Sequence, residues 1–314
     1  MGFSTETQEG LAFQQGEQMK KSMTINLLLA LTALGIFASC APANKSSLAS
    51  DASKQSKIIG GVVSTEEFQK QNGIVGLIMV FTDENGNQNG ALCTGSMIKP
   101  NIVLTAAHCL ELPPKSKLNA AIVFFSTDFH AVMKEIGAGD KTHARAIVKV
   151  QRNEQYLKGK GSDNDVGLIR FAGDVPAGFQ VANMPTAQVA AALHAGATVT
   201  LSGYGVDKYV MGTNGTTKTS EPIGTGDGIL RQVSGIKLLA LSQDQNEMQF
   251  DQSTGAGACH GDSGGPAYLV DSNKKAYLVG VTSRGEGLCN QSSVYSSVFG
   301  YSKWIDSTIQ KLMQ

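Results

Sequence analysis

A serine set among glycines is the strongest sign of chemistry in this sequence. Residues 261–266 read GDSGGP, which places Ser263 in a tight turn whose backbone N–H groups can stay open. Two such donors can hold the oxyanion that forms when a hydroxyl attacks a carbonyl group. The segment therefore predicts acyl transfer by a nucleophilic serine, against the plainer interpretation of a glycine-rich loop.

A serine hydroxyl is a weak nucleophile at neutral pH and needs a base. Histidine, with an unperturbed pKa of about 6.5, can take its proton. His108 is the candidate because it ends an apolar segment and lies beside Cys109, which can fix the backbone. His260 is close to Ser263 in the sequence and stays open as an alternative on chemistry alone.

The base in turn needs a carboxylate that holds its tautomer and stabilises the imidazolium. Asp165 leads directly into the apolar residues 166–169. Asp163 lies in a polar loop, where a solvated side chain is the default for an aspartate. The sequence thus predicts a catalytic triad of His108, Asp165 and Ser263.

Short apolar and β-branched segments, separated by turns and by many of the 36 glycines, must position these side chains. Strands are expected over residues 73–82, 91–98, 101–107, 120–125, 144–150 and 165–171, and again over 197–203, 229–241, 266–270, 276–282 and 293–299. This pattern predicts an all-β barrel or sandwich architecture. A helix is expected only at the C-terminus, where apolar residues recur at spacings of three and four, at Tyr301, Trp304, Ile305, Ile309 and Leu312.

Length and charge limit the function classes. The 314 residues fit a presequence followed by one all-β unit of roughly 250 residues. Lys and Arg total 26, and Asp and Glu also total 26, without a long run of either sign. The charge balance gives no support for nucleic acid as a partner.

The N-terminal 57 residues divide into three parts that precede the domain. Residues 1–18 are polar and come before a complete signal that starts at Met19, so we interpret them as a non-native or mis-called N-terminal extension and expect no function from them. Residues 19–41 begin with Met19-Lys20-Lys21 and continue into an apolar run over 25–37, which is shorter than the roughly 18 to 20 residues of a membrane span and predicts an export signal. Residues 42–57 are polar and predict a linker or pro-segment, and residues 58–314 form the domain.

Cys40 lies where bacterial lipoprotein signals place their lipid-accepting cysteine. Residues 37–40 read FASC, which resembles that motif, although Phe37 stands where an aliphatic residue is usual. Diacylglycerol on Cys40 would tether the exported protein to a bacterial membrane, facing the periplasm or the exterior. The alternative is cleavage after Ala41 by ordinary signal peptidase, which would give a secreted form.

Four of the five cysteines remain when Cys40 is set aside, and they can pair in three ways. They are Cys93, Cys109, Cys259 and Cys289. An exported chain meets an oxidising compartment, so disulfides are expected. The sequence has no CxxC pair, which argues against a zinc site.

The chain from residue 58 onward resembles the trypsin/chymotrypsin family of serine proteases. Four motifs in the family's order carry the resemblance: IIGG at 58–61, TAAHC at 105–109, DVGLI at 165–169 and GDSGGP at 261–266. The resemblance implies two packed six-stranded antiparallel β-barrels with a C-terminal helix. It places His108 and Asp165 on the first barrel and Ser263 on the second.

The resemblance also assigns the remaining catalytic features. The N–H groups of Gly261 and Ser263 would hold the oxyanion. The implied disulfides are Cys93 with Cys109 and Cys259 with Cys289. Substrates would be proteins or peptides, and no metal or organic cofactor would be required.

Family members are made as inactive precursors, and the resemblance implies the same here. An activating protease would cleave after Lys57 and free the ammonium of Ile58. That ammonium would insert and pair with Asp262, and the pair would order the oxyanion hole.

A pocket for the residue before the scissile bond, here called the P1 pocket, follows from the same resemblance. Basic-specific relatives carry an aspartate at its base, six residues before the nucleophile, where this chain has Gly257. The other pocket positions are also uncharged: Ala258, Ser283, Gly285 and Ser293. A neutral P1 residue is therefore expected, while Arg284 replaces a tryptophan that is common on the pocket wall.

A catalytically silent binding protein with a protease fold is the alternative function, because a fold alone does not fix activity. No residue of the predicted triad is lost in this sequence. A secreted serine endopeptidase is therefore the preferred interpretation.

Overall fold

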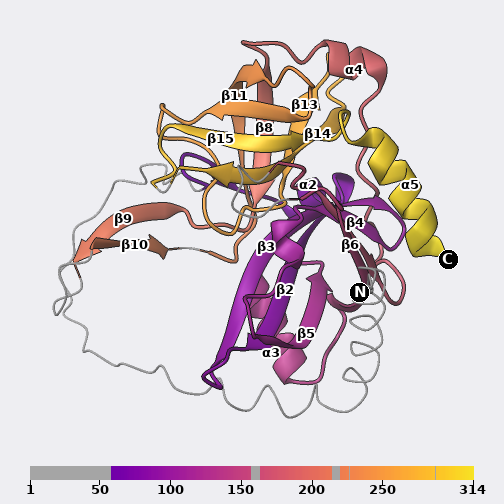
Figure 1. The fold of residues 1–314 in the computed structure, drawn as a ribbon, viewed down its shortest axis with the longest axis vertical. Helices are drawn as coiled ribbons and strands as arrows, with labels where there is room; N and C mark the ends of the chain where they lie inside the picture. Colours follow the sequence, from indigo (N-terminus) through magenta and orange to yellow (C-terminus); the bar gives the residue numbers. More distant parts are fainter. Residues whose placement is uncertain (1–57, 157–162, 214–219, 226, 287) are drawn as a thin grey trace, which may run out of the picture.

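The computed structural model describes residues 58–156, 163–213, 220–225, 227–286 and 288–314 (Figure 1). The expected export signal, the lipidation site Cys40 and the cleavage site after Lys57 lie outside these residues. Within the described part of the chain, no helix has both the length and the apolar character needed to cross a bilayer.

The first barrel contains six antiparallel strands and closes on itself. Its order is β2-β3-β4-β7-β6-β5. The strands are β2 (Ile74–Thr82), β3 (Gln88–Lys99), β4 (Ile102–Thr105), β5 (Lys117–Phe124), β6 (Ala144–Arg152) and β7 (Gly167–Phe171). Strand β2 pairs with both β3 and β5 and is buried along most of its length, which explains its nearly continuous apolar sequence.

The second barrel also has six strands, and the pairing of β8 with β11 closes it. Its order is β8-β11-β12-β15-β14-β13, and the two-residue β1 (Val62–Val63) adds to the edge of β11. The strands are β8 (Thr198–Gly203), β11 (Arg231–Leu241), β12 (Glu247–Asp251), β13 (Pro266–Val270), β14 (Ala276–Gly285) and β15 (Ser292–Ser297). The predicted pair of six-stranded antiparallel barrels is confirmed.

The C-terminal helix is also confirmed, as α5 (Ser302–Met313), which buries Ile305, Ile309 and Leu312. The prediction that no other helix exists was wrong. The chain also forms α2 (Glu66–Gln71), α3 (Phe129–Gly137), α4 (Ala187–Ala191) and the short 3₁₀ helix η1 (His108–Leu110). These helices are too short for a repeating apolar pattern to stand out.

Helix α3 shows what stabilises such a short element. The carboxylate of Asp128 caps its start by accepting hydrogen bonds from the N–H groups of His130 and Ala131, at 2.8 and 3.1 Å. Val132 and Ile136, four residues apart, bury one face in the core. Capping and one buried face stabilise the nine residues.

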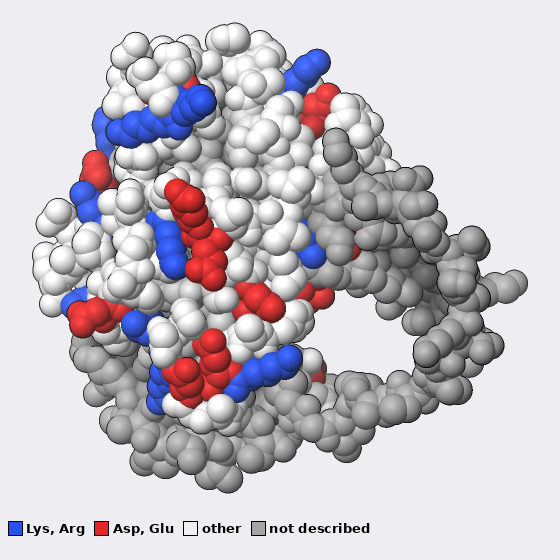
Figure 2. All heavy atoms as spheres, turned by 180° about the vertical axis from the view of Figure 1, so that it is seen from behind, with Lys and Arg blue, Asp and Glu red and all other residues white. Residues whose placement is uncertain are grey.

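Four strands were not expected from the sequence: the two-residue β1, and β9 (Lys208–Thr213), β10 (Ser220–Thr225) and β12. Strand β12 has only Met248 and Phe250 as buried apolar residues, alternating with polar ones. Strands β9 and β10 pair with each other as a separate two-stranded sheet, which extends away from the barrels (Figure 1). On the face drawn in Figure 2, acidic and basic side chains lie close to one another, with no large area of a single sign.

Candidate active site

His108 stands at the point where the first barrel opens toward the second. Strand β4 ends at Thr105, and His108 begins the η1 turn three residues later. The disulfide between Cys93 on β3 and Cys109 fixes this turn to the barrel. The imidazole therefore projects from a short covalently braced segment.

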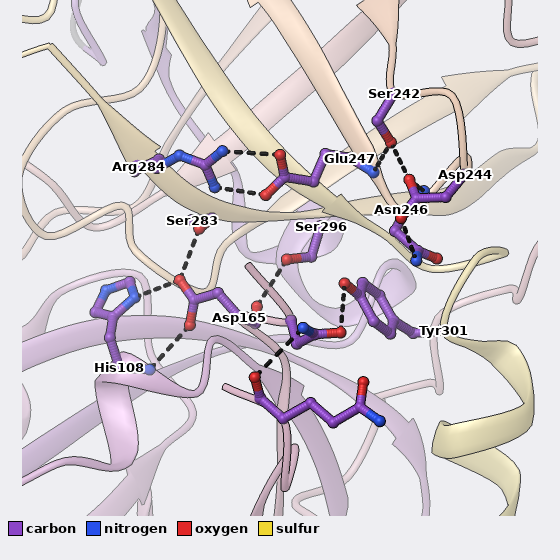
Figure 3. A network of polar contacts seen from close by, with 12 residues as sticks. His108, Asp165, Ser242, Asp244, Asn246, Glu247, Ser283, Arg284, Ser296 and Tyr301 are labelled. Carbon is purple, nitrogen blue, oxygen red and sulfur yellow. Dashed lines mark hydrogen bonds and ion pairs between the residues drawn. The ribbon is translucent and has the colours of Figure 1, made fainter. Parts of the chain in front are cut away.

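Asp165 binds this histidine twice. Its Oδ1 accepts a hydrogen bond from the backbone N–H of His108 at 2.9 Å, and its Oδ2 lies 2.7 Å from Nδ1 of the ring (Figure 3). Asp165 is fully buried, whereas 30% of the His108 side chain is exposed. This arrangement leaves Nε2, rather than Nδ1, available to take a proton from a reacting group.

The second barrel completes the environment of Asp165. The hydroxyl of Ser283 on β14 donates to Asp165 Oδ2 at 2.7 Å, and the hydroxyl of Ser296 on β15 donates to the Asp165 backbone carbonyl at 2.8 Å (Figure 3). A buried carboxylate is costly unless donors surround it. Here donors from both barrels satisfy it, so its position depends on how the barrels pack.

The turn that carries Ser263 is held from the first barrel by Thr94. The backbone N–H of Thr94 donates to the carbonyl of Ser263 at 2.8 Å, and its hydroxyl donates to the carbonyl of Gly261 at 3.2 Å. Gly264 has φ +77°, and a Cβ there would lie 2.0 Å from the Thr105 hydroxyl oxygen, so the turn requires glycine.

The N–H groups of Gly261 and Ser263 donate to no other protein group within the described part of the chain. The two carbonyl contacts to Thr94 leave these donors open. Open backbone donors next to a serine are what an oxyanion requires.

No hydrogen bond joins Ser263 Oγ to the His108 ring among the described residues. Nε2 of His108 instead lies 3.7 Å from the Cys109 sulfur. Hydrogen bonds between catalytic groups are often long before substrate binds and shorten in the complex. The structure thus brings His108 and Asp165 into direct contact and places Ser263 in a turn anchored to the same barrel.

Asp262 is fully buried beside the serine. Its carboxylate accepts hydrogen bonds from the N–H groups of Gly205 and Cys259, both at 2.8 Å. Burial raises the pKa of Asp262 to about 6, against the opposing effects of these two donors and of the Arg231 charge. The carboxylate of Asp262 is therefore fixed in position, but its contacts compensate its buried negative charge only in part.

Ile58, the residue expected to become the new N-terminus, is fully buried with the core of the second barrel. Its neighbour Ile59 forms an isolated bridge with Gly257, whose N–H donates to the Ile59 carbonyl at 2.8 Å. The start of the described chain thus packs directly against the segment that carries the P1 pocket residues.

The five expected P1 pocket residues come from two segments and a facing strand. Gly257 and Ala258 are buried in the turn before Cys259. Gly285 on β14 is paired with Ser293 on β15. Ser283 lies on β14, beyond the strand end at residue 282 that the sequence predicted, and its hydroxyl donates a hydrogen bond to Asp165.

The two implied disulfides are present, Cys93 with Cys109 and Cys259 with Cys289. His108 and His260 each lie near one of these pairs. Because the sulfurs are oxidised, they are not thiolates and do not offer the ligands that zinc takes.

Sequence reasoning missed three residues that shape this site: Thr94, Ser296 and Gln252. Thr94 and Ser296 act through contacts between barrels, and Gln252 lies behind Gly257. The position of Thr94 directly after Cys93 was the one local signal that could have marked it.

Comparison with known proteins agrees with this geometry. A family profile described as Trypsin matches residues 63–305. Serine protease SP24D of Anopheles gambiae is 27% identical over 258 residues, covering 81% of this chain and 82% of that protein. Chymotrypsin of Phaedon cochleariae is 26% identical over 231 residues, covering 73% and 76% of the two chains. A solved structure of HL collagenase, at 21% identity, shares the fold with a TM-score of 0.59 over 80% of this chain and 98% of that one.

Proposed function

Because the chain belongs to the trypsin family of serine proteases and is a serine endopeptidase, we propose that Ser263, His108 and Asp165 are its catalytic triad. The observation that carries the proposal is the 2.7 Å contact between Nδ1 of His108 and the fully buried carboxylate of Asp165. This contact orients the ring so that Nε2 acts as the base.

Catalysis proceeds by acyl transfer. Nε2 of His108 takes the proton of Ser263 while Oγ bonds to the peptide carbonyl carbon, and the N–H groups of Gly261 and Ser263 stabilise the oxyanion. The imidazolium then gives its proton to the leaving amine as the C–N bond breaks. Water, deprotonated by the same imidazole, hydrolyses the acyl-enzyme and restores Ser263.

The test uses the full chain processed after Lys57, with Ile58 verified as the N-terminus by sequencing. A fluorophosphonate probe should label Ser263, and the label should be found on the peptide that contains it. Folded, processed protein that stays unlabelled would reject the triad and favour a silent binding protein.

Activation by cleavage after Lys57 forms the second part of the proposal. Ile58 lies buried with the second-barrel core, and the carboxylate of Asp262 is buried without full compensation, with its pKa raised to about 6. A new ammonium at Ile58 would supply a cation to that carboxylate. Substitution of Lys57 by Gln should block activation by a trypsin-like activator, and full activity of an uncut Lys57→Gln chain would reject this step.

A neutral P1 preference is the third part. The P1 pocket residues Gly257, Ala258, Ser283, Gly285 and Ser293 carry no charge. A Lys or Arg side chain would find no carboxylate among them, and a buried unpaired charge is costly. A peptide library varied at P1 tests this, because preferred cleavage after Lys or Arg would overturn it.

Export, with lipidation of Cys40, is the last part and rests on the leader sequence. The proposal is that a bacterial cell exports the protein and tethers it through diacylglycerol on Cys40, with ordinary secretion as the alternative. The relatives described above come from insects, so the leader alone supports a bacterial source. Cys40→Ser should move the protein from the membrane fraction to the soluble fraction, and unchanged partitioning would reject lipidation.

A further inference from the structure

The base of the P1 pocket is already filled by a side chain from outside the predicted set. A Cβ added to Gly257 would lie 2.4 Å from Cγ, Cδ and Nε2 of Gln252. Gln252 is fully buried, and it therefore takes up the volume that a side chain at position 257 would occupy.

Hydrogen bonds hold the Gln252 amide in this place. Its backbone N–H donates to the carbonyl of Gln291 at 2.9 Å, which extends the pairing of β12 with β15. Its Nε2 donates to the carbonyls of Ala258 and Cys289 at 2.8 and 3.2 Å. The amide cannot swing aside for a long P1 side chain without losing both side-chain bonds.

Ser293, another expected P1 pocket residue, lies on the facing strand β15. It is paired with Phe250 on β12, and Gln252 follows Phe250 by two residues, so Ser293 and Gln252 belong to one face of the sheet. Only 2% of the Ser293 surface is exposed. Gly285, opposite Ser293, adds no side chain of its own.

Two oxygens on this face lack hydrogen-bond partners among the described residues. They are Oε1 of Gln252 and Oγ of Ser293, and both are buried. Buried polar atoms without partners are rare and costly in folded proteins, so each of them calls for an explanation. Filling of space alone does not explain the buried amide of Gln252 and the buried hydroxyl of Ser293, because apolar side chains would fill the same volume without unpartnered oxygens.

We propose that Gln252 closes the base of the P1 pocket, with Ser293 narrowing it, and restricts the enzyme to peptide bonds that follow a small uncharged residue: Gly, Ala, Ser, Thr or Val. This inference rests on the proposed function, because the pocket positions come from the family resemblance. It goes further in naming the size of the substrate side chain and the residue that sets it.

The test measures kcat/KM of the full chain, processed after Lys57, on peptide amides that differ only at P1. Wild-type enzyme should cleave after Ala and Val, with Leu, Phe and Lys slower by about tenfold or more. Gln252→Ala should raise the ratio for Leu over Ala by about tenfold or more, because it empties the base of the pocket. Ser293→Gly should raise the same ratio by widening the pocket.

Gln249→Ala provides the matched control, because Gln249 is an exposed glutamine of β12, the strand that ends just before Gln252, and its amide donates to the Ser292 hydroxyl. Its Leu-to-Ala ratio should equal that of wild type. Active enzyme in every sample is counted with the fluorophosphonate, which reports on Ser263 independently of P1.

Wild-type preference for Leu, Phe or Lys over Ala would overturn the inference while labelling still supports the triad. An unchanged ratio in labelled Gln252→Ala would overturn the role of Gln252. If Gln252→Ala does not fold, the P1 preference of the wild type and the Leu-to-Ala ratio of Ser293→Gly test the inference instead. Unlabelled wild-type enzyme would instead reject the proposed function.

Discussion

Both barrels have apolar cores, but the second barrel buries more charges and hydroxyls than the first, where Asp165 and the hydroxyls of Thr94 and Thr105 are buried. Around the first barrel, the buried cluster runs through Ile74, Leu104, Phe124 and Leu168. The second barrel buries Asp262, the ion pair of Arg231 with Asp207, and a series of serines on β14 and β15. Apolar packing suits a part that must hold His108 and Asp165 rigidly.

The buried polar groups of the second barrel lie at the proposed P1 pocket and at the proposed activation site. Asp262 adjoins Ser263, and Gln252 and Ser293 are proposed to border the P1 pocket. Buried polar groups need particular partners, so a change of partner can shift the structure between two states.

The largest effect is expected at the junction of the barrels. Ser263→Ala should lower kcat by about 10⁶-fold while the fold stays intact, because the nucleophile is lost. His108→Ala, on the other barrel, should cost about as much, and the double variant should be no worse than either single one. Peptidase assays with circular dichroism as the folding check measure this, and near wild-type activity in Ser263→Ala would refute the triad.

Removing the buried cation of the second barrel should have the next largest effect. Arg231 is 2% exposed, lies 3.2 Å from Asp207 through Nη2, and donates through Nη1 to the Ile229 carbonyl at 3.2 Å. Arg231→Met should lower the free energy of unfolding by about 3–5 kcal/mol, because it removes one partner of a buried ion pair and leaves Asp207 without this guanidinium.

The exposed ion pair of Lys115 with Glu84 in the first barrel provides the control. Lys115→Met should change the free energy of unfolding by no more than about 1 kcal/mol. Urea unfolding followed by fluorescence compares the two variants. Equal losses would contradict the view that the second barrel depends on its buried charges.

The uncut chain should lose stability as pH rises through the titration of Asp262. Its folded pKa, about 6, exceeds the ordinary value of 3.8, so the folded state binds the proton more tightly than the unfolded state. The proton-linked stabilisation is complete below pH 3.8 and is lost as the pH passes about 6, a difference of about 3 kcal/mol. Asp262→Asn should remove this dependence between pH 4 and about 6.5, since the amide does not titrate.

Cleavage after Lys57 should change the pH dependence of stability. The new ammonium of Ile58 would favour the charged carboxylate, so the cleaved enzyme should lose less stability over this pH range than the uncut chain. Urea midpoints at a series of pH values measure both forms. Identical pH profiles for the uncut wild type and Asp262→Asn would show that Asp262 does not titrate in this range.

The two regions also differ in how much of them the sequence predicts. Continuous apolar segments predicted β2 to within one residue and β13 at both ends. A strand that is buried on both faces has apolar residues at nearly every position, so the local sequence marks it. Strand β12 and the short helices were not predicted. Each has few apolar residues, and only the packing of these residues on neighbouring elements shows that they are buried. The family motifs indicated the proposed triad residues directly.

What sequence could not predict in the site is contact between distant residues. Ser283 and Ser296 reach Asp165 across 118 and 131 residues of chain. Gln252 is only five residues from Gly257, yet nothing local shows that its side chain turns back beneath that glycine. Such contacts depend on the final packing of the barrels, which is also why the motifs predict the reaction better than its specificity.

The smallest effect is expected for a charged residue of the second barrel that is partly exposed. It tests whether burial of the charge, and not its place in the second barrel, determines how much free energy of unfolding is lost. Arg284 on β14 forms a two-point ion pair with Glu247 on β12, at 2.5 and 2.8 Å (Figure 3), but 32% of its side chain is exposed. Arg284→Gln should therefore lower the free energy of unfolding by at most about 1 kcal/mol at low salt, and by less in 1 M NaCl, because water and ions screen the pair. Urea unfolding at both salt concentrations measures it, with Arg231→Met as the buried counterpart. A loss as large as that of Arg231→Met would show that the second barrel is sensitive to any lost charge.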